Sequence, residues 1–532
     1  MKKGSTSRIW IKLLVILIAV FLIAGIANVI LESVIRHKIA QSLRELSPTI
    51  QSNYSSIHVN LLASTASIEN LQLYFIPYYN LDKHRHSLYF QEASLNGISF
   101  FKLIFEKKLS INHVDLEKAE IRLDQFLIDK RDSAQQSVFT HFDVPFKSVT
   151  IKNFALSEAT VWLGSDSARK PLLKGDIAIF NQELMLSNKI DSFHMGSFDC
   201  SLSDIHYPIQ GRYHELHINK LNIDSRKETL HVDSVSIIPL LSKMELGRRL
   251  GHQADWVEAS IAEIQMSKLK VADLLHNKFV ADRLVLSECN VHIFRDRKLP
   301  REEKIQPMLN DYLNRIAWDV RLNTFKINNA TVVSEEMPKD GTKSGFLKIA
   351  KINVSMSPVH NHPGKNSALT SDTYVEGSIM NSGTITAHIR APLKENVYTI
   401  KGTIKNLELP KLNPSAENLG KFHVESGILN NLDFHFVATE EKATGEIVGE
   451  YHNLVLEKLK LEHGEKKVAA IPSFFLKHLI IPKNKDKSLD VAKRTGKIDF
   501  KRDPTRVVTF YFLKSLLDGI RDSFDLGFLL PK

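Results

Sequence analysis

The sequence predicts a mainly β protein, in which an N-terminal transmembrane helix precedes one long, mostly antiparallel β-sheet, with a short helical cap at the C-terminus. Three observations predict it: residues 13–31 carry no charge, apolar residues alternate with period two through most of the remaining chain, and the last segment has apolar residues at helical spacing. We therefore expect an anchor with its cytosolic tip and amphipathic follow-on at residues 1–47, an elongated repeat-built domain at 48–470, and a basic, partly helical segment at 471–532.

The uncharged run has the length of a membrane span. About 20 apolar residues at a rise of 1.5 Å each cross the roughly 30 Å hydrocarbon core of a bilayer. A cleaved signal peptide, cut near Ala24 or Ala27, is the alternative, but its apolar core is usually only about 7–15 residues long. Lys2, Lys3, Arg8 and Lys12 precede the run, which favours a cytosolic N-terminus and places the rest of the chain outside the cytosol.

Composition and charge narrow the class of protein. Hydrophobic residues make up 43% of the chain and charged residues 24%, which is ordinary for an ordered globular domain. Cys200 and Cys289 are the two cysteines, and we expect both to be free thiols because they stand among alternating apolar positions.

The net charge of +10 is concentrated near the C-terminus, where residues 457–506 contain 14 Lys and Arg against 7 Asp and Glu. This segment lacks the interleaved aromatics of a nucleic-acid reader, so we expect no nucleic-acid partner. An anionic membrane surface and an ordinary solvated surface both remain open. The candidate membrane-surface residues are Lys493, Arg494, Lys497, Lys501, Arg502 and Arg506.

One pattern of fifteen residues returns four times: apolar, x, apolar, x, x, apolar, x, apolar, x, x, small, x, apolar, x, apolar. The copies start at Leu109, Val149, Phe279 and, more loosely, Val320, with the small position at Ala119, Ala159, Cys289 and Ala330. The second pair follows the first at offsets of 170 and 171, which indicates a duplicated block at about 90–180 and 261–356.

The spacing within this motif predicts a structural feature. Side chains alternate between faces along a strand, so a step of three would turn the next apolar set to the wrong side. A bulge or tight turn must therefore reset the phase. The apolar face so formed is predicted to be lined by Leu109, Ile111, Val114, Leu116, Val149, Ile151, Phe154, Leu156, Val161, Leu284, Leu286, Val291, Ile293, Phe325 and Ile327.

Other segments break the alternation. Charged stretches at 129–137 and 295–304 are expected to be loops, and a helix is expected within 305–316. Residues 370–413 are more polar and contain Gly377, Gly383 and Gly402, which suggests edge strands or an open part of the sheet. Near the C-terminus, one helical face carries Phe510, Leu513, Leu517, Ile520 and Phe524, as expected either of a cap on the β core or of an interfacial membrane helix.

The motifs of common enzymes are missing from the sequence. It has no Gly-rich phosphate loop, paired-Cys zinc motif or nucleophile-elbow serine. His84 with His86 and His360 with His362 are the best metal candidates, but each pair lies in a polar stretch without a third ligand. We therefore expect no catalytic residues, metal or cofactor, and a protein that is not an enzyme.

In the order of these features, the chain resembles the AsmA-like proteins of diderm bacterial envelopes. The resemblance covers essentially the whole chain and rests on the anchor, the repeated motif and three segments: GTIKNLELPKLNP at 402–414, GEIVGEYHNLVL at 445–456 and the most distinctive, GKIDFKRDPTRVVTFYFLKSLLDG, at 496–519. It implies a curled β-sheet with a lipid-lined groove, related to bridge-like lipid transfer proteins.

The resemblance also implies a location and a role. It predicts a single-pass inner-membrane protein with most of its chain in the periplasm, which assists phospholipid transport between the inner and outer membranes. Phospholipid and an outer-membrane or envelope protein are the partners it suggests. The alternative is a non-enzymatic scaffold that supports outer-membrane assembly. The residues alone are equally compatible with a closed core that holds no lipid.

Overall fold

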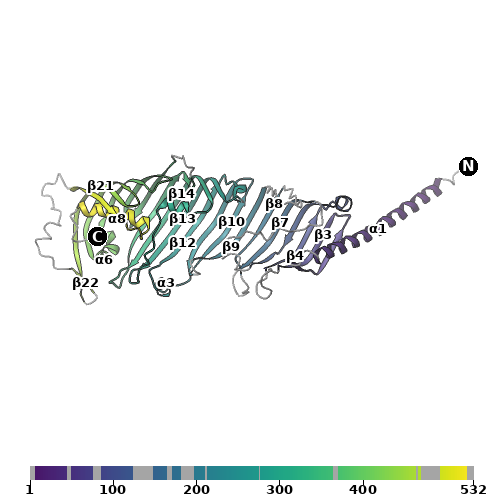
Figure 1. Cartoon of the computed structure of the whole chain (residues 1–532), viewed down its shortest axis with the longest axis horizontal. Helices are drawn as coiled ribbons and strands as arrows, with labels where there is room; N and C mark the ends of the chain where they lie inside the picture. The colour runs from purple at the N-terminus through teal and green to yellow at the C-terminus, as the bar shows by residue number, and fades with distance from the viewer. Residues whose placement is uncertain are drawn as a thin grey trace. The chain divides into compact units, whose positions relative to one another are not determined.

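The computed structural model describes residues 6–44, 50–75, 86–123, 148–163, 171–180, 197–209, 213–274, 276–362, 369–462, 465–468 and 492–523. It is mainly β, as the sequence predicts (Figure 1). The chain divides into two compact units. Unit 1 is Met1–His206 with Lys220–Arg226, and unit 2 is Tyr207–Asn219 with Lys227–Lys532, so each unit contains one block of the repeat.

Unit 1 begins with α1 (Thr6–Arg44), a helix of 39 residues that includes the uncharged run and projects from the strands in Figure 1. Among the residues that the structure describes, no helix is long and apolar enough to qualify as a membrane span. The other elements are β1 (Ile50–Asn53), β2 (Ser56–Asn60), β3 (Thr65–Phe75), β4 (His86–Asn96), the π-helical turn η1 (Lys102–Glu106), β5 (Lys108–Glu117), β6 (Glu120–Leu123), β7 (Ser148–Leu163) and β8 (Leu173–Phe180). β9 (Ser197–Ile209) and β10 (His214–Asp224) contribute residues to both units.

Unit 2 continues with β11 (Thr229–Pro239), α3 (Lys243–Leu250), β12 (Asp255–Ser267), α4 (Val271–Leu274), β13 (Lys278–Asp296), α5 (Leu309–Asn314), β14 (Asp319–Met337), β15 (Gly345–Ser357) and β16 (Val359–His360). There follow β17 (Thr370–Ile379), β18 (Gly383–Pro392), β19 (Tyr398–Glu408), η3 (Leu409–Leu412), α6 (Asn413–Asn418), β20 (Phe422–Ala438), β21 (Lys442–Glu462), β22 (Glu465–Val468), β23 (Ala492–Lys501) and α8 (Val508–Ser523).

The copies of the repeated motif lie beside each other as parallel strands. β5 pairs with β7 so that Leu109 faces Val149 and Leu116 faces Leu156. β13 pairs with β14 in the same way, with Phe279 opposite Val320. The prediction of an antiparallel sheet is therefore wrong at these pairs, although most other neighbours are antiparallel. In a parallel pair, in-register copies place like residues side by side, which is why the same pattern recurs in both strands.

At the second step of three in the motif, the predicted phase reset is present in all four copies. The residue before the small position is left-handed each time: Lys118 (φ 49°), Glu158 (φ 49°), Glu288 (φ 54°) and Asn329 (φ 55°). The small residue that follows is buried each time, with 0% exposure at Ala119, 4% at Ala159, 6% at Cys289 and 5% at Ala330. The backbone irregularity thus turns the next side chain back to the apolar side.

α8 packs on the end of the sheet of unit 2 as a helical cap (Figure 1). It also covers a strand edge, because Asp522 accepts a hydrogen bond of 2.7 Å from the backbone N–H of Lys497, and Asp518 one of 3.1 Å from Asp499. Both donors lie on β23, whose other edge pairs with β21. The helix therefore satisfies N–H groups that an open edge would leave exposed.

The buried face of α8 differs from the predicted one. It consists of Val508, Tyr511, Ser515, Gly519 and Ser523. Of the predicted face, Leu513 is 43% and Leu517 38% exposed, Phe510 is half-buried, Ile520 packs against the core, and Phe524 lies outside the described residues. The small residues on this face allow the helix to approach β23 closely. A pattern of large apolar residues does not reveal a face of this kind.

Two further expectations are corrected. Residues 370–413 are not an open edge, because β17, β18 and β19 each pair on both sides. Gly402 leaves room for a neighbour, since a Cβ atom there would lie 2.3 Å from the ring of Phe434. The loop expected at 295–304 begins only after Asp296, because Arg295 belongs to β13 and binds the Asp255 carboxylate with hydrogen bonds of 2.7 and 2.8 Å.

Other expectations agree with the structure or fall outside it. The helix expected within 305–316 is α5. Cys200 and Cys289 are free thiols, as predicted. The charged stretch at 129–137 lies outside the described residues, as do 471–491 of the C-terminal segment.

Candidate functional site

A continuous row of apolar residues crosses the sheet of unit 2. Residues that stand directly opposite in paired strands have side chains on the same face, so the row can be followed from strand to strand. It runs through Val232, Ile264, Leu286, Ile327, Val354, Val375, Ala387, Gly402, Phe434, Ile447 and Gly496. We call this set the apolar row.

A second row on the same face runs beside it, two positions away on each strand. It contains Met266, Leu284, Phe325, Met356, Thr373, Ile389, Ile400, Phe436, Gly445 and Ile498. Only Thr373 is polar in this second row. The two rows together make one apolar face in unit 2.

The opposite face is polar at the same level. The residues between the two apolar rows are His231, Gln265, Val285, Lys326, Ser355, Tyr374, His388, Lys401, His435, Glu446 and Lys497. Because alternate residues face opposite sides, this set belongs to the other surface of the sheet. One face is therefore suited to water and the other to apolar contacts.

Burial changes along the apolar row. Ile264, Leu286, Ile327 and Val354 are half-buried. Towards the C-terminus the same row enters a packed core, in which Phe434 is 6% and Ile447 1% exposed and Tyr511 of α8 is 1% exposed. The face is thus closed under α8 and partly accessible over β12–β15.

Unit 1 repeats the arrangement. Its apolar face contains Ile57, Ile68, Ala93, Leu116, Leu156, Ile177 and Cys200, which are successive cross-strand partners from β2 to β9. The C-terminal part of α1 packs on this face, where Ile35, Ile39 and Leu43 contact the cluster around Ile57, Ile111 and Val114. The helix predicted as the anchor therefore leads directly onto the apolar face of unit 1.

The predicted lining residues share these faces, but their burial varies. Ile111 and Val114 are buried, and Leu109, Leu116, Ile151 and Phe154 pack against their cluster. Leu156, Val161, Leu284, Leu286, Val291, Ile293, Phe325 and Ile327 are half-buried, and the side chain of Val149 lies outside the described set. Ile264, Val354, Val375 and Phe434 also lie on this face but were not among the predicted lining residues, although they too stand in period-two alternation.

The predicted membrane-surface residues do not form one patch. Lys497 and Lys501 are exposed on β23, whereas Arg494 stands opposite Gly449 on the apolar side of that strand. Arg502 donates a 2.6 Å hydrogen bond to the carbonyl of Gln306, and the Arg506 guanidinium lies 5.0 Å from the ring centre of Phe510. Lys493 belongs to β23, but its side chain is not among those that the structure describes.

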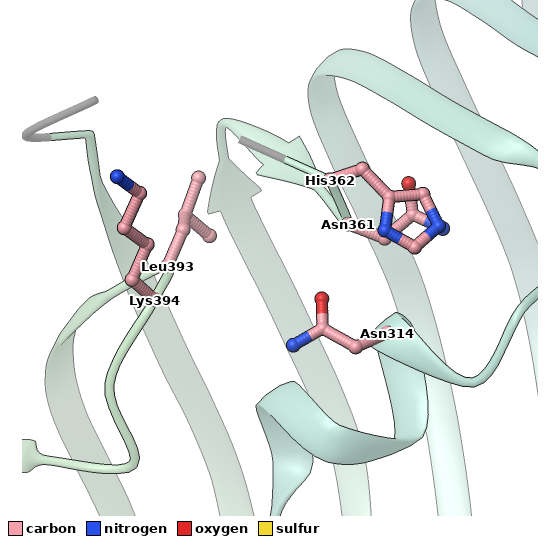
Figure 2. Close-up of a pocket in the computed structure, with 5 residues that line it drawn as sticks. All are labelled: Asn314, Asn361, His362, Leu393 and Lys394. Atoms are coloured by element: carbon pink, nitrogen blue, oxygen red, sulfur yellow. The ribbon is translucent and has the colours of Figure 1, made fainter. Parts of the chain in front are cut away.

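Of the two histidine pairs singled out in the sequence, the structure describes the side chains of His360 and His362. His84 lies outside the described residues, and the side chain of His86 is likewise not described. The Nε2 atom of His360 is 3.7 Å from an Asp319 carboxylate oxygen. The pKa of His360 is lowered, mainly because the imidazole is partly buried. His362 lines a surface cavity of about 300 Å³ together with Asn314, Asn361, Leu393 and Lys394 (Figure 2).

Asn361 has a structural role in this cavity. Its amide accepts a 2.8 Å hydrogen bond from the backbone of Val320 and donates to the carbonyls of Leu313, Ile316 and Trp318. These bonds fasten the end of α5 to β14 and leave little of the Asn361 side chain for a ligand.

A second group of possible metal ligands consists of His423, Glu425 and Glu457, whose ligand atoms lie within 4.8 Å of one another. Ion pairing accounts for this group, because His423 hydrogen-bonds Glu417 at 2.8 Å and Glu425 at 3.3 Å.

The extended apolar face is therefore the strongest candidate for a functional site. No protein-family model matches the chain, and no curated protein was found to match it.

Proposed function

We propose that this protein is a membrane-anchored, periplasmic AsmA-like protein that shields lipid acyl chains in an apolar β-groove. In this role it assists phospholipid transport between the inner and outer membranes. The observation that carries the proposal is the apolar row, which crosses paired strands without a charged residue from Val232 to Gly496 and is half-buried at Ile264, Leu286 and Ile327.

The physical argument concerns exposed apolar surface. Soluble proteins rarely expose contiguous apolar patches larger than a few hundred Å², because such surface favours association. Acyl chains are long, flexible and apolar, so they suit a face that extends across many strands and consists almost entirely of apolar residues. Removing such a face from water is favourable at about 25 cal/mol per Å².

The apolar faces of the two units support different parts of the proposal. In unit 1, Ile35, Ile39 and Leu43 of α1 pack into one apolar cluster with the strands, so the proposed anchor is joined to the apolar face of this unit. In unit 2, the core around Tyr398, Tyr451 and Tyr511 fills the space beneath α8, and each of these side chains is 1% exposed. Lipid would therefore occupy the half-buried stretch before this core.

The membrane anchor is also part of the proposal and rests on the sequence of residues 13–31. With its basic lead in the cytosol, the chain would cross the inner membrane once. A periplasmic reporter fused after Leu46 should then be active and the N-terminus retained. A mature protein that begins near Asn28 would show a cleaved signal peptide instead.

Lipid content tests the main proposal. The full chain, purified in a mild detergent and then exchanged into one that is easily removed, should carry phospholipid in native mass spectrometry at a defined ratio. Phospholipid that is lost with the detergent, together with an unchanged cooperative unfolding transition, would indicate that the faces are packed internally. That result would favour the alternative, a non-enzymatic scaffold for outer-membrane assembly, which the closed core of unit 2 makes physically reasonable.

A further inference from the structure

A group of exposed apolar side chains lies in unit 1 on two neighbouring turns. Leu62 in the β2–β3 turn is 88% exposed. At η1, the preceding Phe101 is 67% exposed, and Ile104 and Phe105 within the turn are 43% and 72% exposed. The ring centres of Phe101 and Phe105 are 4.9 Å apart. Large apolar residues gathered at this exposure are unfavourable in water and indicate a surface that contacts something apolar.

The β2–β3 turn is hydrogen-bonded to α1 and to the segment that leads into η1. The backbone N–H of Leu61 donates a 3.0 Å hydrogen bond to the carboxylate of Glu32, the residue that directly follows the uncharged run. The backbone N–H of Ile98 donates a 2.9 Å hydrogen bond to the carbonyl of Ser64 in the β2–β3 turn. Ile98 is also buried in the cluster that contains Ile35 of α1.

These contacts fix the height of the exposed group relative to the helix. A helix rises 1.5 Å per residue, so Glu32 marks the point where α1 leaves the hydrocarbon if residues 13–31 span it. Leu62 lies one residue from the N–H that binds Glu32. The apolar turns are therefore at the level of the headgroups and the first part of the acyl chains.

The charges around the group match an anionic bilayer surface. Lys102, Lys107 and Lys108 are exposed on and beside η1, and Glu106 forms an ion pair with Lys108 at 3.0 Å. Arg36 and Lys38 are exposed on the next turn of α1. Phe, Leu and Ile together with Lys and Arg are the composition of segments that lie in the membrane interface.

We propose that Leu62, Phe101, Ile104 and Phe105 form a membrane-contact rim, which inserts into the headgroup region of the anionic bilayer that α1 crosses. The rim would hold unit 1 against the membrane, so that lipid could pass from the leaflet to the apolar face without crossing water. This inference rests on the proposed anchor, and the experiment separates the two.

The test uses the full chain in phosphatidylglycerol-containing proteoliposomes, with single fluorophore-labelled cysteines at position 18, 105 or 342. The native cysteines are first replaced by Cys200→Ala and Cys289→Ala; alanine stands at the position equivalent to Cys289 in the other three copies of the motif. I18C reports on the anchor and F105C on the rim. T342C, on an exposed turn of unit 2, is the matched control.

Nitroxide-labelled lipid is then added as a quencher. We expect quenching at position 105 by lipid labelled near the headgroup, with a blue-shifted emission, and quenching at position 18 by lipid labelled deep in the acyl chain. Position 342 should respond to neither. Quenching at 18 with a response at 105 no greater than at 342 would overturn the rim and leave the anchor in place, whereas no quenching at 18 would overturn the anchor itself.

A second variant checks that the apolar side chains cause the contact. The fluorophore is moved to L62C, and Phe101→Ser with Phe105→Ser should reduce its quenching, with the unfolding transition unchanged because both rings are exposed. Unchanged quenching at position 62 in this variant would also contradict the proposed rim.

Discussion

Gly496 of β23 and Gly519 of α8 lie so close that a Cβ atom on Gly496 would be 2.0 Å from the carbonyl oxygen of Gly519. This approach brings Asp518 and Asp522 within hydrogen-bonding distance of the free edge of β23. The close glycine contact therefore determines how the C-terminal helix closes the sheet.

The first prediction concerns this contact. Gly496→Ala should lower the free energy of unfolding by about 1–3 kcal/mol, because the added methyl group meets backbone that cannot move without losing the edge hydrogen bonds. Urea unfolding of the full chain and the rate of proteolysis within α8 measure the effect. Thr495→Ala, at an exposed neighbour, should stay within about 0.5 kcal/mol of the parent protein. Equal stability of the two variants would show that the contact is looser than described.

The second prediction concerns the left-handed residue of the repeated motif. Lys118 has φ 49° and precedes Ala119, which is 0% exposed. A left-handed conformation costs a residue with a Cβ atom about 1–2 kcal/mol, and glycine avoids that cost. Lys118→Gly should therefore be more stable than Glu117→Gly by about 1 kcal/mol or more, because Glu117 stands in the ordinary part of β5. The order of the two urea midpoints is decisive, and a reversed order contradicts the backbone assignment.

The third prediction compares the accessible and the closed parts of the apolar row. Leu286→Asp should give a folded protein that has lost its bound lipid, since a charge among acyl chains is costly to desolvate. Ile447→Asp lies in the packed core and should destabilise unit 2 by several kcal/mol. Lys326→Asp, on the opposite face, should change neither property. Should Leu286→Asp abolish cooperative unfolding as Ile447→Asp does, the face is a closed core throughout.

The fourth prediction is a pH dependence at His423. Its hydrogen bond with the Glu417 carboxylate raises the pKa of this histidine above the usual value of 6.5. The protonated form is favoured in the folded state, so the stabilisation is fully present below pH 6.5 and is lost as the pH rises through the folded-state pKa. His423→Gln should remove a decline in urea midpoint that sets in as the pH rises above 6.5. An identical decline in His423→Gln and in the exposed control His435→Gln would assign the dependence to other groups.

The fifth prediction concerns the exposed cations of β23. Proteoliposomes that carry the full chain should dock anionic acceptor vesicles better than neutral ones. Each cation near such a surface contributes about 1 kcal/mol, so Lys497→Glu with Lys501→Glu should weaken docking by about tenfold or more. Added salt should act in the same direction. Lys339→Glu with Lys343→Glu, on an exposed turn of unit 2, is the charge-matched control, and an equal loss there would exclude a specific role for β23.

Several features could be predicted from the sequence because they are local. Alternation at Leu284 and Leu286 predicted a strand with one apolar face, and the step of three in the motif predicted the irregularity that the structure has at Glu288 and Asn329. The helix near Tyr312 and the C-terminal helix were likewise visible as periodic apolar residues. Periodicity reports the conformation of a segment, since side-chain direction follows directly from the backbone.

The sequence by itself thus determined the strands, the apolar side of each strand and the place where its phase is reset. Only the tertiary structure decided that motif copies pair in parallel, that the small face of α8 is buried rather than Leu513 and Leu517, and that the apolar row is closed at Ile447 yet half-buried at Leu286. The reason is physical: alternation fits parallel and antiparallel neighbours equally well, whereas burial depends on which distant segment covers a face, and that is set by the fit between surfaces rather than by the pattern within either one.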